Sequence, residues 1–149
     1  MLRRIACCCA LASLAWGCAG SDEPRAIDAP ELEPAALEAR LVKDLAAGKS
    51  GARCAYKTLG KAGSERYLWV LCQTYEGGRV TWAVSEPVVV EVDPSAAAVT
   101  EIRVPGDGDR YEVDVARMFP EELQSTVLQR DAEEANRRVH ALEAELASP

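Results

Sequence analysis

Apolar residues recur at four-residue intervals directly after Pro34. Leu37, Leu41 and Leu45 are spaced i, i+4 and i+8, and Gly48 follows as a helix stop. This spacing predicts one amphipathic helix. Its apolar face needs a second element, such as a sheet, to cover it.

Residues 52–104 show the period-two pattern of β-strands, with turn residues between the runs. Both faces of one run are apolar, which predicts a central strand over residues 66–75. Pro87 is expected to interrupt the sheet. Because turns rather than helices join the runs, the strands are expected to be antiparallel. The expected runs are 52–59, 66–75, 79–85, 88–92 and 99–104, followed by a short run through Tyr111, Val113 and Val115.

A long helix is predicted from Pro120, with Glu121 and Glu122 in its first turn, where the helix dipole favours acidic residues. We expect the part from Leu123 to dock on the sheet. Beyond Ala135 two alternatives stay open: the helix packs back on the sheet, or it projects as a short coiled coil. Its apolar positions alternate in steps of four and three: Leu128, Ala132, Ala135, Val139, Leu142 and Leu146.

The predicted fold class is α+β. An N-terminal helix lies on an antiparallel meander of four to five strands, and a C-terminal helix follows. We place the α+β domain at residues 35–119 and the C-terminal helix at residues 120–149. A helix laid across such a meander is similar to cystatin-like folds. That likeness implies an exported binding or inhibitor module for a protein or an apolar ligand.

The first eighteen residues are organised as an export signal. Two arginines precede an uncharged apolar run over residues 5–16, which is too short to span a bilayer as a helix. Residues 14–18, Leu-Ala-Trp-Gly-Cys, resemble the lipobox of bacterial lipoproteins. The resemblance implies a signal peptide at residues 1–17, acylation of Cys18 and anchorage to a bacterial membrane through the attached lipid.

The leader leaves two alternatives open, ordinary cleavage after Ala19 and a retained anchor. Residues 18–34 are interpreted as the lipidated cysteine and a flexible tether, because three prolines disfavour a helix there. No Asp follows Cys18. The lipoprotein resemblance therefore implies the outer membrane as the destination in a cell that has one.

Export changes the interpretation of the six cysteines. Three lie in the leader and Cys18 ends it, which leaves Cys54 and Cys72. Counted outward from the hairpin loop near Gly63, these two fall opposite each other on neighbouring strands, close enough for a disulfide. A redox pair favours C-x-x-C spacing, which this pair lacks. The sequence predicts a structural disulfide, which persists in an exported protein.

Composition and motifs argue against several functions. The chain has 17 basic and 24 acidic residues and a net charge of -7, which argues against nucleic-acid binding. Its one histidine, His140, is expected on the solvent side of the last helix, without a second ligand for a metal. Glu76, Glu86 and Glu91 have no spacing that marks a site. No phosphate-binding loop or hydrolase motif is present. We therefore predict no catalysis, no metal and no cofactor.

Aromatic residues concentrate on the predicted central strand. Tyr67, Trp69 and Tyr75 are expected in the core, or alternatively on a ligand or partner surface. The function predicted from the sequence is that of a non-catalytic, lipid-anchored envelope protein. Its partners are the membrane and an envelope protein, which binds the sheet face or the C-terminal helix. The cystatin-like module is the alternative.

Overall fold

A computed structural model describes residues 30–147 of the chain. The predicted signal peptide, the lipidation site at Cys18 and most of the predicted tether lie outside the described residues. In chain order the elements are α1 (Pro34–Leu45), β1 (Arg53–Ala62), β2 (Glu65–Glu76), β3 (Arg79–Asp93), β4 (Ala98–Arg103), a short 3-10 turn η1 (Gly108–Arg110), α2 (Tyr111–Met118), α3 (Glu121–Val127) and α4 (Ala132–Ala147).

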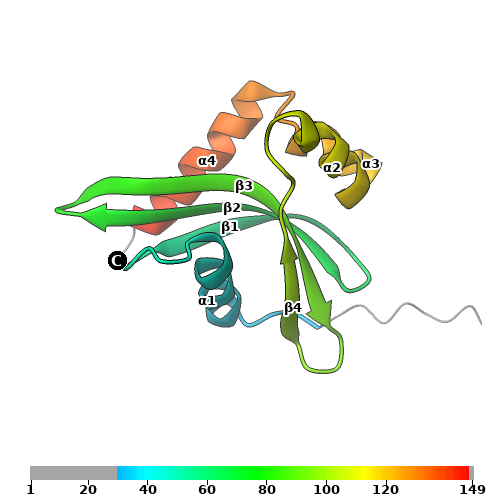
Figure 1. Cartoon of the computed structure of the whole chain (residues 1–149), viewed down its shortest axis with the longest axis horizontal. Helices are drawn as coiled ribbons and strands as arrows, with labels where there is room; N and C mark the ends of the chain where they lie inside the picture. The colour runs from blue at the N-terminus through cyan, green and yellow to red at the C-terminus, as the bar shows by residue number, and fades with distance from the viewer. Residues whose placement is uncertain (1–29, 148–149) are drawn as a thin grey trace, which may run out of the picture.

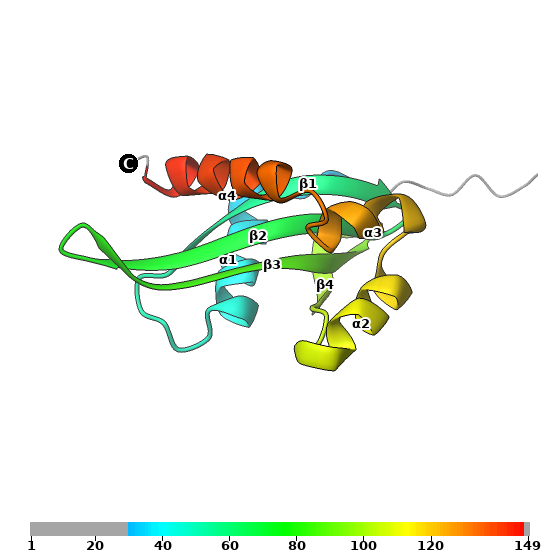
Figure 2. The same ribbon diagram turned by 90° about the horizontal axis from the view of Figure 1, so that it is seen from above.

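The four strands form one antiparallel sheet in the order β1-β2-β3-β4. Helix α1 lies on one side of the sheet. Helices α2, α3 and α4 lie on the opposite side (Figures 1 and 2). The α+β class and the antiparallel meander are therefore confirmed, with four strands.

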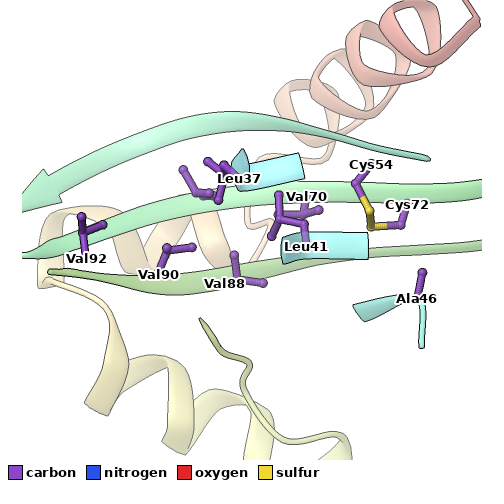
Figure 3. Close-up of a cluster of buried hydrophobic side chains, with 10 residues drawn as sticks. Leu37, Leu41, Ala46, Cys54, Val70, Cys72, Val88, Val90 and Val92 are labelled. Atoms are coloured by element: carbon purple, nitrogen blue, oxygen red, sulfur yellow. A yellow bond between two sulfur atoms is a disulfide. The ribbon is translucent and has the colours of Figure 1, made fainter. Parts of the chain in front are cut away.

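The face of the sheet under α1 carries the main apolar core. Glu33 caps the helix by accepting a hydrogen bond from the backbone N–H of Ala36 at 2.7 Å. Leu37 and Leu41 then point into the sheet, as the four-residue spacing predicts (Figure 3). The buried members of this cluster are Leu37, Leu41, Ala46, Cys54, Leu68, Val70, Cys72, Val88, Val90 and Val92.

The opposite face of the sheet is covered by two smaller clusters. Near α4, Trp69 and Leu71 of β2 pack with Leu142 and Leu146. Near α2 and α3, the buried cluster consists of Tyr67, Val89, Val115, Phe119 and Val127. Since β2 is buried on both faces between residues 66 and 74, the prediction of a central strand is confirmed.

The predicted disulfide is present. Cys54 of β1 stands opposite Cys72 of β2 in the strand register, and their sulfur atoms are bonded at 2.04 Å. The bridge lies in the core under α1 (Figure 3). It therefore joins an edge strand to the centre of the sheet.

The short strand expected through Tyr111, Val113 and Val115 is wrong, because this segment is helix α2. Val113 is exposed, whereas Tyr111, Val115 and Phe119 pack in one cluster. These three residues are spaced by four, which is also a helical pattern. Where a short segment fits both the strand period and the helical period, the residues that pack against it determine which structure forms.

The single long helix expected from Pro120 is divided into α3 and α4. Gln129 adopts a left-handed conformation with φ of 51°, which ends the first helical segment. Asp131 then caps α4 by accepting a hydrogen bond from the backbone N–H of Glu134 at 3.0 Å. Of the two alternatives for the part beyond Ala135, the helix packs back on the sheet, because Leu142 and Leu146 are buried against β1 and β2.

Pro87 does not interrupt the sheet, because β3 runs through it. Val92 donates its backbone N–H to the carbonyl of Ser64 at 2.9 Å. Bonding alternates along an antiparallel ladder, so Pro87 directs its nitrogen away from β2. On that side β4 pairs only with residues 89–93. The missing N–H therefore costs no hydrogen bond within the sheet.

Candidate functional site

The three aromatic residues named as a possible partner surface do not form one. The side chains of Tyr67 and Trp69 are only 4% and 1% exposed, because helices α2, α3 and α4 cover their face of the sheet. Tyr75 is 37% exposed and donates its hydroxyl hydrogen to Gln73 Oε1 at 2.6 Å. Tyr67 and Trp69 are therefore core residues, and only Tyr75 faces solvent.

A buried arginine is the most unusual feature of the helical side of the sheet. Arg138 of α4 is 3% exposed, although a guanidinium is charged at all physiological pH values. Its Nη2 donates to Glu134 Oε1 at 3.4 Å, a long contact, and its Cζ lies 4.9 Å from the centre of the Trp69 ring. Arg138 is thus held between a carboxylate and an aromatic face.

The remaining donors of Arg138 have no acceptor in the described part of the chain. Neither Nε nor Nη1 has a hydrogen-bond partner there, and both atoms are buried. Leaving a buried donor without an acceptor costs about 1–3 kcal/mol, and more for a charged group. Such a group points to an acceptor supplied from outside the described residues.

Arg138 lines a cleft between α3 and α4, which we call the α3–α4 cleft. The cleft has a volume of about 400 Å³. Gln129, with its left-handed conformation, lies in the segment that joins the two helices, and residues of both helices line the cleft. The lining residues comprise two hydroxyls, two arginines and two acids: Ser125, Thr126, Arg130, Asp131, Glu134 and Arg138.

Sequence reasoning missed Arg138 because its spacing from Glu134 also fits an ion pair on an exposed helix. The apolar pattern does contain the signal. Ala135, Arg138 and Leu142 are buried at steps of three and four, whereas Val139 is only half-buried. Arg138 therefore occupies a core position of the helix. A charged residue at a core position of a helix is the signal in the sequence that could have identified Arg138.

A second cleft, of about 280 Å³, lies beside β3 where β4 has ended, and we call it the β3 cleft. Trp69 Nε1 donates to Ser85 Oγ at 2.9 Å on its wall. Burial, with Asp107 nearby, raises the pKa of the Glu86 carboxyl above its ordinary value of 4.5. Burial and Glu86 likewise raise the pKa of Tyr111. Both shifts favour the protonated, uncharged forms of Glu86 and Tyr111.

The other candidate groups are dispersed. His140 is exposed, as predicted, with its Nδ1 3.0 Å from Glu143 Oε2. Between residues 30 and 147, no three His, Cys, Asp or Glu side chains are gathered so as to hold a metal ion. Within the same range, no helix combines the length and apolar character needed to cross a membrane.

Comparison with protein-family models, with curated proteins and with solved structures found no match to this chain.

Proposed function

We propose that the protein is an exported, lipid-anchored and non-catalytic protein of the bacterial cell envelope, and that it binds a ligand in the α3–α4 cleft. The binding surface thus belongs to the C-terminal helix rather than to the sheet. Helices cover the core of both sheet faces, whereas the cleft beside α4 is open.

The observation that carries the binding function is the unpartnered guanidinium of Arg138. Arg138 lines a cleft large enough for a small molecule, and its Nε and Nη1 are buried without a partner among the described residues. A protein that gained nothing from a ligand there would be more stable with an apolar side chain at this position. The unsatisfied donors therefore favour a binding role over a purely structural one.

Two observations support export and anchorage. The disulfide between Cys54 and Cys72 is of the kind that persists in oxidising compartments. The leader that ends at Cys18 resembles a lipobox. One acylated cysteine carrying two or three chains anchors a domain stably.

The non-catalytic assignment is supported by the surroundings of the hydroxyl groups. Ser125 and Thr126 line the α3–α4 cleft, but His140 is exposed and contacts Glu143. His140 is also not among the residues that line this cleft, where a general base for these hydroxyls would have to lie. Ser85 accepts the indole N–H of Trp69 in the β3 cleft.

The anchor is tested by metabolic labelling with a palmitate analogue in cells that produce the full chain. We expect Cys18→Ala to abolish the label and to move the protein from the membrane to the soluble fraction. Cys9→Ala, which changes a cysteine inside the predicted signal peptide, is the matched control and is expected to keep the label. Unchanged labelling of the Cys18→Ala protein would refute lipid anchorage.

A second candidate is an exported binding or inhibitor module of the cystatin-like kind, acting through the β2–β3 hairpin. The hairpin projects beyond the helices (Figure 1). Tyr75 and Val80 are paired across its strands, and Val80 is 49% exposed. Replacing both by Ser separates the candidates: loss of partner binding with an intact α3–α4 cleft favours this module.

A further inference from the structure

We propose that the α3–α4 cleft binds a small zwitterion, a molecule with one carboxylate and one ammonium group, which is the chemistry of a free amino acid. This inference rests on the proposed binding function of the cleft and adds the class of ligand. It does not depend on the lipid anchor.

The carboxylate is assigned to Arg138. The Nε and Nη1 atoms carry three of the five N–H donors of a guanidinium, and neither has an acceptor among residues 30–147. A charge-assisted hydrogen bond to a carboxylate is about 2.7–2.9 Å long. The existing contact to Glu134 is 3.4 Å, so it leaves Nη2 able to share a carboxylate with either neighbouring nitrogen.

Trp69 fixes the guanidinium in this position. Its ring lies 4.9 Å from Arg138 Cζ and is itself held by the hydrogen bond to Ser85 Oγ. Stacking on an aromatic face leaves the edge of the guanidinium plane available for acceptors. The donor edge is therefore preorganised before a ligand enters, which reduces the entropy lost on binding.

The ammonium is assigned to the two acids of the cleft. Asp131 and Glu134 line it beside Arg130 and Arg138, so the lining carries two negative and two positive side chains. A phosphate or a simple anion would meet the two carboxylates as like charges, which is unfavourable. A zwitterion places opposite charges against both pairs. The hydroxyls of Ser125 and Thr126 can donate to or accept from either end.

The size of the cleft agrees with this ligand. Its volume of about 400 Å³ lies within the range of small-molecule pockets, about 300–1,000 Å³. It has room for an amino acid with a side chain, together with some ordered water.

Calorimetric titration of the full chain in detergent, with four probes, tests the proposal. The probes are L-alanine, N-acetyl-L-alanine, which lacks the ammonium, L-alaninamide, which lacks the carboxylate, and inorganic phosphate. We expect L-alanine to bind best. Removal of either charged group should weaken binding by about tenfold or more, the effect of one lost charge-assisted hydrogen bond.

Two pairs of variants assign the two ends of the ligand. Arg138→Met replaces a buried charge by an apolar side chain of similar length, a change that proteins often tolerate. Arg138→Met should weaken the binding of L-alanine by about tenfold or more. Arg137→Met, at an exposed position on the same helix, should leave this binding unchanged. Glu134→Gln should reduce the preference for L-alanine over its N-acetyl derivative, and Glu133→Gln is its control.

Three outcomes would overturn the proposal. Phosphate binding as tightly as L-alanine would make the cleft a simple anion site. Equal binding of L-alanine and N-acetyl-L-alanine would show that the cleft does not recognise an ammonium group. If Arg138→Met still weakened the binding of both probes, the cleft would remain a binding site, but not one for a zwitterion. If none of the probes binds a folded protein, the cleft is not a site for a zwitterion, and the palmitate experiment decides the anchoring function separately.

Discussion

The two faces of the sheet are packed in different ways. One continuous helix, α1, covers its face with evenly spaced leucines, and the buried cluster there is apolar and contains the disulfide. Three shorter helices cover the other face, and their cores form two separate clusters. The α3–α4 cleft and the β3 cleft involve residues of this second side or of its connecting segments. A smaller cleft, of about 70 Å³, lies beside α1 and is lined by Leu37 and the buried Arg66.

The difference suits two separate roles: the apolar face under α1 stabilises the fold, and the face covered by three helices carries the proposed binding cleft. A single regular helix presents one apolar stripe and excludes water from the sheet beneath it. On the other face Arg138 of α4 places a charged side chain at a buried position, and the exposed Asp131 caps the same helix beside the α3–α4 cleft. We therefore expect substitutions of buried apolar residues to change stability most, and those of the polar and ionisable residues on the helical side to act through charge.

The largest effect is expected from Leu41→Ala under α1. Leu41 is completely buried, and removing its side chain should lower the free energy of unfolding by about 2–5 kcal/mol. Denaturant unfolding under oxidising conditions measures the change. Val113→Ala, at an exposed position of α2, is the control and should cost less than about 0.5 kcal/mol. Equal losses for the two variants would contradict the place of Leu41 in the core under α1.

The disulfide is expected to have the next largest effect. Replacing Cys54 and Cys72 together by Ala should lower the free energy of unfolding by about 3 kcal/mol, because the unfolded chain regains the freedom of an 18-residue loop. Reduction of the wild-type protein should give a similar loss in the same unfolding experiment. The stability of the double variant should not change with reductant. If it did change, the reductant would be acting on something other than the bridge between Cys54 and Cys72.

At high pH the helical side should lose stability through Tyr67. Burial and its hydrogen bond to Glu65 Oε2 raise the pKa of Tyr67 from 10.0 to about 12. The folded protein then holds a proton that the unfolded chain releases, so stability falls as pH rises from 10 to 12. Tyr67→Phe should remove up to about 2 kcal/mol of this fall. Unfolding curves at pH 9 to 12 test it, with Tyr75→Phe as the control for loss of a phenol.

The smallest effect is expected from Glu86 in the β3 cleft. Its raised pKa means that the folded protein favours the protonated carboxyl, so stability falls as pH rises above 4.5. Glu86→Gln should therefore stabilise the protein at pH 7 but not at pH 4. The gain should stay under about 1 kcal/mol, because the carboxyl is half-exposed and screened by water. Glu76→Gln, at the exposed end of β2, is the control, and an equal gain from it would point to net charge instead.

Much of the fold follows from local patterns that admit one solution. The leucines of α1 have a helical period only, and the run 66–75 is apolar on both faces, so it had to be central. The register of Cys54 and Cys72 follows from counting along a hairpin. By contrast, residues 111–115 fit both periods, and only packing against Phe119 and Val127 selects the helix.

The candidate site could not be predicted in the same way. Glu134 and Arg138 look like an exposed i, i+4 pair, and the same spacing occurs in Glu133 and Arg137, which are exposed. Nothing local distinguishes the two pairs except that Arg138 shares a helical face with Ala135 and Leu142.

The sequence by itself determined the helix α1, the antiparallel meander with its central strand and the pairing of the two cysteines. Each depends on residues near one another in the chain, whose periodicity restricts the backbone directly. Only the tertiary structure decided that α4 docks along its length, that Tyr67 and Trp69 are covered, and that Arg138 is buried. Burial depends on what lies opposite a residue, and for α4 that is β1 and β2, which lie far away in the sequence.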